Sequence, residues 1–379
     1  MAGIVILGGG KIGRMIANLL LDCGDYQVTI GDSDPEALQR LQEKHVRLQT
    51  VQVDATDAKQ LAAVLQGNDA VISALSFHFN PLVAQVSLEQ GVSYFDLTED
   101  VETTRAVRQV ASQAADGQIF MPQCGLAPGF ISIVANDLTK SFEKLDRVHM
   151  RVGALPQFPT GELKYNLTWS TDGLINEYCN PCEAIEENQR IEVLPLEGLE
   201  HFSLDGVRYE AFNTSGGLGT LCESLDGKVR ELNYKTVRYV GHRHLMKFLV
   251  NELRMNQKRD LLKDIMEDAV PITFQDVVVT FCTVTGWRNG NFVQISDARK
   301  IYADQWGNEH WSAIQITTAS GICAVVDMHF ARQLPATGFV KQEDVELDAF
   351  LNNRFGKNYH SSSATRFSHA HSNGNGVSQ

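Results

Sequence analysis

The chain has little of what a membrane protein or a nucleic-acid-binding protein needs. It carries 33 Lys and Arg against 46 Asp and Glu, which gives a formal net charge of −13. This acidic balance argues against nucleic acid or an anionic membrane surface as a partner. No apolar run approaches the roughly 20 residues that a membrane-spanning helix needs. The first apolar run starts at Ile4, so we expect no secretion signal before it.

Metal-ligating patterns are scarce as well. The seven cysteines are an odd number and lie scattered along the chain, so we expect reduced thiols in a cytoplasmic protein. Only Cys179 and Cys182 have the CxxC spacing, and a zinc or redox site would need a second pair or a thioredoxin-like context. We therefore predict no metal site and interpret the pair as two thiols that lie close in sequence.

What the sequence does contain is a glycine-rich turn in the stretch IVILGGGKIG near its start. An apolar run is followed by Gly8, Gly10 and Gly13 at the G-x-G-x-x-G spacing. The first glycine makes a tight turn, the second lets the backbone approach a pyrophosphate, and the third lets a helix pack against the sheet. The amides of the helix that starts at Lys11 and Ile12 would hold the phosphates. A plain turn is the alternative, but the strand before and the helix after favour dinucleotide binding.

An acidic residue then predicts which dinucleotide binds. Asp32, with Ser33 beside it, ends the next apolar run, and no Lys or Arg follows before Arg40. A carboxylate there accepts hydrogen bonds from a ribose 2′-hydroxyl and repels a 2′-phosphate, so we predict NAD rather than NADP. Asp54 and Ala55 follow the third run. Asp54 either approaches the adenine or caps the next helix, and the sequence leaves both open.

The first 125 residues alternate short apolar runs with helical segments, which predicts a doubly wound parallel sheet. Ligands of such sheets lie beyond the carboxyl ends of the strands. The expected strands are Ile4–Leu7, Val28–Ile30, Leu48–Val53, Ala70–Ala74, Ser93–Leu97 and Gln118–Met121. The loops at those ends place Ala74, Leu75, Gly125, Leu126 and Ala127 near the cofactor.

From about Asp146 the pattern changes to longer strands, several of which alternate apolar with polar residues. The sequence RNGN from Arg288 to Asn291 is typical of a tight hairpin. These features predict a second, α+β domain with a mostly antiparallel sheet. The expected strands are Val148–Val152, Lys228–Val240, Val277–Val284, Asn291–Tyr302 and Ile314–Thr318, followed by a helical segment, Gly321–Phe330.

Four segments resemble blocks of the saccharopine dehydrogenase family in order and spacing, most closely those of its lysine 6-dehydrogenase branch. They read AVISALSFHFNPLVAQVSLEQGVSYFDLTED, CGLAPGF, TWSTDGLINEY and VRYVGH. The resemblance implies a homo-oligomeric NAD(P)-dependent enzyme that works at a carbon–nitrogen bond. One departure is Ala127, where saccharopine-forming relatives carry Asp in a GxDPG loop, and this weakens an assignment to saccharopine itself. Asp32 fits an NAD user better than the NADP-using reductases.

The resemblance also implies how the chain divides. Residues 1–125 would form the dinucleotide-binding domain, completed by a C-terminal helical part at 319–357. Residues 126–318 would bind substrate and form the dimer sheet. The last residues, 360–379, are rich in Ser, His, Asn and Gly, and we expect them to be disordered.

Oxidative deamination of an amine needs three kinds of group. The amine enters protonated, with an ordinary pKa near ~10.4, so a base must take its proton. Asp96 and Glu99, after the fifth strand, are candidates, although a helix cap and a solvated loop charge are the alternatives. His242 in GHRH is a candidate proton shuttle or substrate contact, or else a structural histidine.

The site also needs an anionic surface for the cationic intermediate and a cation for a substrate carboxylate. Arg243 is the candidate clamp, with Arg238 and Arg151 as competitors. Pocket-lining candidates, which could equally be packing residues, are Lys164, Tyr165, Trp169 and Thr171.

The leading hypothesis is therefore an NAD-dependent amino-acid dehydrogenase acting on the amine of lysine or a similar diamino acid. The second is reductive carbon–nitrogen coupling of the kind catalysed by saccharopine or carboxynorspermidine dehydrogenases. The third, a non-catalytic NAD-sensing protein, would bind NAD without transferring hydride.

Overall fold

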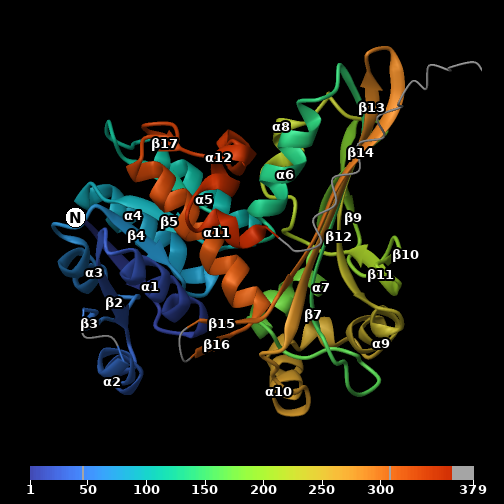
Figure 1. Ribbon diagram of the computed structural model, residues 1–379. Coiled ribbons are helices and arrows are strands. Elements are labelled where there is room, and N and C mark those ends of the chain that lie inside the picture. Colours follow the sequence, from blue (N-terminus) through green and yellow to red (C-terminus); the bar gives the residue numbers. More distant parts are fainter. Residues whose placement is uncertain (45–46, 307–308, 361–379) are drawn as a thin grey trace, which may run out of the picture.

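The computed structural model describes residues 1–44, 47–306 and 309–360, and it shows two domains (Figure 1). The first surrounds the N-terminal strands, and the second is built on a tall twisted sheet at the right of the view. The C-terminal elements return to pack on the first domain. Of the predicted tail at 360–379, residues 361–379 lie outside the described part of the chain.

The first domain is a seven-stranded sheet in the order β17-β6-β5-β4-β1-β2-β3, with every pair parallel. Ile4 to Leu7 have no exposed surface because helices cover both faces of the sheet. The predicted doubly wound fold is confirmed. The strands are β1 (Ala2–Leu7), β2 (Tyr26–Asp32), β3 (Gln49–Gln52), β4 (Ala70–Ser73), β5 (Ser93–Asp96), β6 (Ile119–Met121) and β17 (Gly338–Phe339). The helices are α1 (Lys11–Cys23), α2 (Pro35–Lys44), α3 (Ala58–Leu65), η1 (Phe77–Phe79), α4 (Asn80–Gln90) and α5 (Val101–Ala111).

The predicted strand at Ile314–Thr318 is wrong, because these residues form the first turns of α11 (Ala313–Phe330). Ser312 caps this helix in a capping box with Gln315. The carboxylate of Asp276 accepts the next free amides, Ala313 N at 2.5 Å and Ile314 N at 3.0 Å. By length and composition alone α11 would suffice to cross a membrane, but most of it is buried inside this fold, where it packs against α1.

The second domain has a sheet in the order β10-β11-β12-β7-β13-β14, with β8 paired to β12 and β9 paired to β8. Only β12 and β7 pair in parallel; the other pairs are antiparallel, as expected. The predicted hairpin joins β13 to β14, and Asn289 (φ 51°) and Gly290 (φ 75°) take the left-handed conformation that such a turn requires. The strands are β7 (Lys144–Pro156), β8 (Cys182–Glu186), β9 (Gln189–Val193), β10 (Glu200–Leu204), β11 (Val207–Asn213), β12 (Glu231–Tyr239), β13 (Asp276–Arg288) and β14 (Asn291–Tyr302).

Shorter elements complete both domains. A small separate hairpin, β15 and β16, leads into α11. The remaining elements are α6 (Phe130–Thr139), α7 (Thr171–Cys179), α8 (Leu221–Ser224), α9 (His242–Lys247), η2 (Phe248–Glu252), η3 (Met255–Gln257), α10 (Arg259–Ala269), β15 (Asp304–Trp306), β16 (Glu309–Trp311), η4 (Gln342–Asp344), α12 (Leu347–Asn352) and η5 (Gly356–Tyr359).

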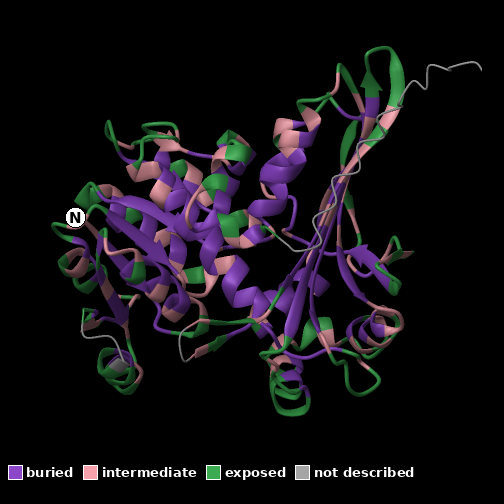
Figure 2. Cartoon of the chain, in the orientation of Figure 1, coloured by how far each residue is buried: buried purple, intermediate pink, exposed green. Residues whose placement is uncertain are grey.

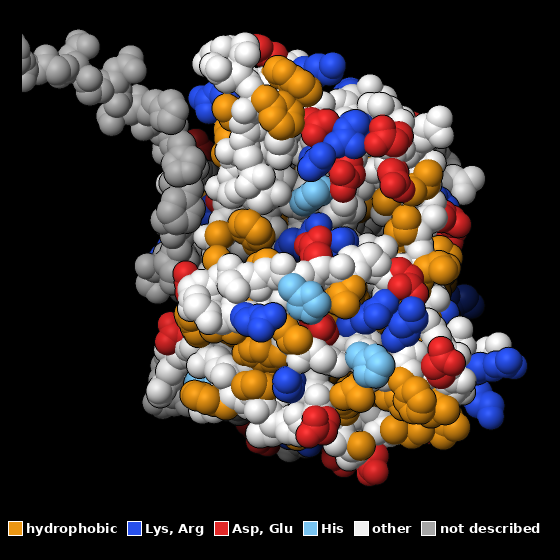
Figure 3. Space-filling model, turned by 90° about the vertical axis from the view of Figure 1, so that its right-hand side faces the viewer, with side chains coloured by type: hydrophobic (Ala, Val, Ile, Leu, Met, Phe, Trp, Pro, Cys, Tyr) orange, Lys and Arg blue, Asp and Glu red, His pale blue; other side chains and the backbone are white. Residues whose placement is uncertain are grey.

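The two faces of the second sheet differ in character. The first sheet, α11 and long stretches of the second sheet consist largely of buried residues (Figure 2). The opposite face carries ion pairs, such as Glu200 with Arg151 and with Lys235, and Figure 3 shows charged side chains of both signs on that side. Because side chains alternate along a strand, Arg238 on β12 points the other way, toward the first domain.

Candidate active site

The glycine turn between β1 and α1 has the geometry of a diphosphate cradle. Gly8 has φ +102°, and a Cβ on Gly13 would lie 1.9 Å from the carbonyl oxygen of Gly8. A Cβ on Gly10 would meet nothing within 4 Å, so the space over the turn is open. No side chain caps α1, and its first amides, from Lys11 and Ile12 onward, remain available to an anion. The residues present therefore fit a dinucleotide.

Asp32 lies at the edge of this turn, at the end of β2. Its Oδ2 accepts the amide of Gly9 at 2.6 Å, and its Oδ1 accepts the amide of Asp34 at 2.9 Å. Ser33 continues the same loop. A hollow of about 400 Å³ lies beside the turn. Its charged lining residues are the cations Lys11, Arg14 and Arg40 and the carboxylate Glu43. The carboxylate that favours a free ribose hydroxyl thus stands near positive charges that could attract a phosphate.

The structure excludes one of the two roles predicted for Asp54, the cap of the next helix. The cap of α3 is Asp57, whose carboxylate accepts the amides of Lys59 and Gln60. Asp54 instead accepts the amide and hydroxyl of Thr56 at 2.9 and 2.7 Å, and these bonds lower its pKa. Asp54 and Ala55 follow β3, and the contact of Asp54 with the adenine stays a prediction.

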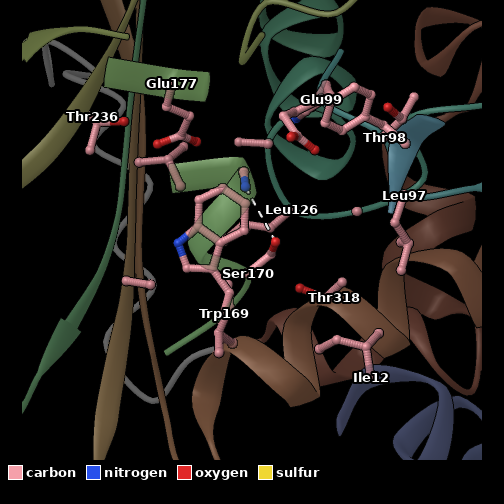
Figure 4. A pocket seen from close by; sticks show the side chains of 18 of the residues that line it. Ile12, Leu97, Thr98, Glu99, Leu126, Trp169, Ser170, Glu177, Thr236 and Thr318 are labelled. Carbon is pink, nitrogen blue, oxygen red and sulfur yellow. Dashed lines mark hydrogen bonds between the residues drawn. The ribbon is translucent and has the colours of Figure 1, made fainter. Parts of the chain in front are cut away.

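Between the two domains lies a cavity of about 200 Å³. It opens at the carboxyl ends of β4, β5 and β6, where the sequence placed the cofactor loops. Figure 4 shows Ile12 and Thr318 on the side of the first domain and Trp169 and Glu177 on the side of the second. The predicted residues that line it are Ile12, Ala74, Leu75, Glu99, Gly125, Leu126, Ala127 and Trp169.

Two carboxyl groups face this cavity from opposite domains. Glu99 comes from the loop after β5 and Glu177 from α7, and both side chains point into the space beside Trp169 (Figure 4). Removal from water raises the pKa of Glu99 to about 7 and that of Glu177 to about 8. The charge of Glu99 also raises the pKa of Glu177, and the charges of Asp100 and Asp96 raise that of Glu99. Such groups exchange protons near neutral pH and attract a cation.

The sequence did not single out Glu177, although helical spacing could have indicated it. Gly173 and Glu177 lie four residues apart, one turn on the same face of α7. A Cβ on Gly173 would lie 2.3 Å from the Trp169 ring and 3.1 Å from Oε1 of Glu99. The absence of a side chain at Gly173 therefore lets the indole and the two carboxyls share the cavity.

Asp96 lies outside the cavity, which corrects its prediction as proton acceptor. It has no exposed surface and accepts hydrogen bonds from Tyr94 Oη, Thr98 N and Gln123 N at 2.7, 2.9 and 3.0 Å. Burial raises its pKa to about 6. Asp96 thus ties together the loops that follow β5 and β6, and the cap of α5 is Asp100.

His242 also lies away from the cavity and cannot serve as the predicted shuttle. It is fully buried, and burial together with the charge of Arg238 lowers its pKa to about 3. Its Nδ1 is 2.8 Å from the carbonyl oxygen of Leu163, and its Nε2 is 3.0 Å from Tyr178 Oη. The ring is therefore a neutral structural group that does not exchange protons near neutral pH.

Of the three arginines considered for a substrate carboxylate, only one lines the cavity. Arg243 donates to the Leu196 carbonyl and to Glu197, and Arg151 pairs with Glu200 on the outer face. Arg238 lines the cavity, which corrects the choice of Arg243.

The remaining pocket candidates lie behind or beside the cavity wall. Lys164 is exposed and bonds to the carbonyl of Val240 at 3.0 Å, and Thr171 is the first residue of α7. Tyr165 is buried with its ring 5.0 Å from the guanidinium carbon of Arg238. The lining residues that the sequence did not name include Ser76, Phe77, Ser170, Gly173, Glu177, Tyr234, Thr236 and Thr318.

Comparison with known proteins agrees with this arrangement of domains. Residues 4–121 match a family model described as saccharopine dehydrogenase NADP binding domain, and residues 125–353 match one described as saccharopine dehydrogenase C-terminal domain. The chain belongs to the saccharopine dehydrogenase family. The predicted family is thereby confirmed, and the first description indicates a nicotinamide dinucleotide cofactor; the lysine 6-dehydrogenase branch stays a prediction.

Individual relatives in this family are distant. The mitochondrial alpha-aminoadipic semialdehyde synthase of Bos taurus is 20% identical over 377 residues, a match that covers 92% of this chain and 39% of the bovine protein. The NADP(+), L-glutamate-forming saccharopine dehydrogenase of Saccharomyces cerevisiae is 22% identical over 326 residues, covering 81% of this chain and 69% of the yeast protein. A structure described as apo saccharopine dehydrogenase (L-Glu forming) from the same yeast shares the fold, with a TM-score of 0.76, 16% identity and coverage of 95% and 96%.

Asp32 offers a test of cofactor choice. Replacing Asp32 by Asn keeps an oxygen for the Gly9 amide but removes the negative charge, so we expect the ratio of the affinity for NAD to the affinity for NADP to fall at least about tenfold, or ~1.4 kcal/mol. Binding of both nucleotides by calorimetry measures this. Asp69→Asn is the matched control. Asp69 also accepts a glycine amide, that of Gly3, but it lies at the amino ends of the strands, away from the glycine turn. An unchanged ratio in a folded Asp32 variant would contradict the assignment.

Proposed function

We propose that the chain is an NAD-dependent amino-acid dehydrogenase that oxidatively deaminates the amine of lysine or of a similar diamino acid. The observation that carries the proposal is the pair of carboxyls, Glu99 and Glu177, facing one cavity at the carboxyl edge of the dinucleotide-binding sheet. A protonated amine is attracted by such a pair, and its proton has an acceptor there. Asp32 favours NAD over NADP as the cofactor.

The chain's own residues account for the proton and the charge. Glu99, once ionised, takes the proton from the ammonium group, whose ordinary pKa is near ~10.4. Glu177 supplies a second carboxyl for the positive charge that develops on nitrogen as the carbon–nitrogen double bond forms. Leu97, Leu126 and Trp169 form apolar walls around the space in which the hydride would be transferred. The bound nicotinamide would accept the hydride, and hydrolysis of the iminium would then release ammonia.

Two further assignments follow the same reasoning. The resemblance of the chain to the saccharopine dehydrogenase family supports a homo-oligomer. The seven cysteines, all free thiols, support a reducing compartment such as the cytoplasm.

A second candidate is reductive coupling of an amine with a carbonyl compound. The similarity to a yeast protein named as a glutamate-forming saccharopine dehydrogenase favours it. The charge of the cavity opposes it, because saccharopine carries three carboxylates and the described cavity wall presents two carboxyls and one arginine.

The direct test is formation of NADH in the presence of L-lysine, ornithine, saccharopine or polyamines at alkaline pH. We expect NADH and ammonia in equal amounts from an amine of the lysine type alone. Turnover of saccharopine only, or oxidation of NADH that requires both an amine and a carbonyl partner, would favour the second candidate. Tight NAD binding without turnover of any amine would favour a non-catalytic role.

The proton acceptor also sets the pH dependence. Glu99 is neutral below its pKa of about 7 and cannot accept a proton there, so kcat/KM should rise with pH through about 7 to about 8. This rise in kcat/KM reports the titration of the two carboxyls together and is not assigned to either one, because their charges interact. A pH–rate profile with saturating NAD measures it. A flat profile between pH 6 and 9 would contradict the role of these two groups.

A further inference from the structure

Arg238 is a cation aimed at the substrate cavity. It lies on β12, and with Tyr234 and Thr236 it belongs to the inward face of that strand. Its side chain is 3% exposed, and no other Lys or Arg is among the described residues that line the cavity.

The guanidinium is held by a chain of directed hydrogen bonds. The Leu163 carbonyl can only accept, so the His242 Nδ1 at 2.8 Å carries the hydrogen and Nε2 is left as an acceptor. Tyr178 then donates its hydroxyl hydrogen to Nε2 at 3.0 Å, and its oxygen accepts from Nε of Arg238 at 3.0 Å. The Val237 carbonyl oxygen accepts a hydrogen bond from Nη1 of Arg238 at 2.9 Å, and the Tyr165 ring packs against the guanidinium.

This cation lacks an anionic partner within the described residues. Arg151 and Arg243 each pair with a glutamate, but no carboxylate among the residues that the structure describes forms an ion pair with Arg238. Glu177 lies close enough to interact with Arg238 through its charge, but among the described residues no hydrogen bond or ion pair joins the two side chains. A buried charge without a counterion is costly, so the cavity favours an anionic ligand group beside Arg238.

We propose that Arg238 binds the carboxylate of the substrate, and that Tyr178 and His242 are positioning residues that fix its guanidinium. This inference rests on the proposed function and narrows its substrate class to an amine that carries one carboxylate. A carboxylate matches the planar donor geometry of a guanidinium, and the two glutamates remain for the amine. A diamine without a carboxylate leaves Arg238 unpaired, and a tricarboxylate leaves at least two of its charges unpaired.

The test compares L-lysine with cadaverine, the same diamine without the carboxylate. We expect the wild type to prefer L-lysine, and Tyr178→Phe to lower the ratio of the two kcat/KM values at least about tenfold, chiefly through the KM for L-lysine. Tyr209→Phe is the matched control, because it removes another buried tyrosine hydroxyl, on the opposite face of the sheet. An unchanged ratio in a folded Tyr178→Phe protein would overturn the proposal.

A binding measurement separates this inference from the proposed function. Hexanoate, a carboxylate without an amine, is titrated calorimetrically into the wild type and Arg238→Gln, each saturated with NAD. Binding that Arg238→Gln loses supports the carboxylate site even if neither amine is turned over, in which case the proposed reaction alone fails. Equal binding by both proteins, or none by the wild type, would overturn the carboxylate site whatever the activity.

Discussion

Replacing Glu99 by Gln is expected to lower kcat by about 100-fold or more, because a neutral amide cannot accept the proton of the substrate ammonium. The amide has nearly the same shape, so Trp169 and Gly173 should keep their packing around it. Steady-state kinetics at alkaline pH gives kcat, and calorimetry gives the affinity for NAD, which should change little because Asp32 and the glycine turn are untouched.

The matched control is Glu102→Gln, a similar loss of charge in the first turn of α5. The Glu102 side chain is 79% exposed and pairs with Arg105 on the surface, so this variant should keep its activity. Full activity of Glu99→Gln, with the pH dependence intact, would show that the base is a different group.

Replacing Gly13 by Ala is expected to abolish tight NAD binding and to lower the free energy of unfolding by about 1–3 kcal/mol. The added Cβ would lie 1.9 Å from the Gly8 carbonyl oxygen, so the turn and the start of α1 must move apart. Thermal unfolding and NAD titration measure the two effects.

Gly10→Ala is the informative comparison, because its Cβ would meet nothing within 4 Å in the protein itself. We expect it to leave the stability unchanged and to weaken NAD binding, since the methyl group occupies the space into which the diphosphate must fit. Equal stability and equal NAD affinity for both glycine variants and the wild type would contradict binding at this turn.

The first domain was predictable because its signals are local. Six of its seven strands overlap the expected apolar runs, and the glycine turn and the carboxyl ends of the strands follow from chain order. The seventh, β17, is only two residues long and was not predicted. The hairpin at Asn289 and Gly290 was equally local. The error at Ile314–Thr318 had a physical cause: its isoleucines and threonines favour strands, whereas the helix is fixed by the Ser312 cap and by Asp276.

The site was only partly predictable, because a sequence gives a residue's position along an element but not which face meets the cavity. Glu99 and Asp96 come from the same loop region, yet one faces the cavity and the other is tied to Tyr94 and Gln123. Arg238 and Arg243 were similar candidates, but Arg238 on β12 lines the cavity, whereas Arg243 on α9 pairs with Glu197. Glu177 lies within the family-like segment TWSTDGLINEY, but nothing in that segment alone shows which of its side chains faces the cavity.

The most direct test of the central claim follows the hydrogen itself. L-lysine deuterated at the carbon that bears the side-chain amine is incubated with the enzyme and NAD, and the reduced coenzyme is analysed by mass spectrometry. The account predicts reduced coenzyme that carries deuterium, formed together with ammonia. Coenzyme that is not reduced, or that is reduced without the label, would contradict it.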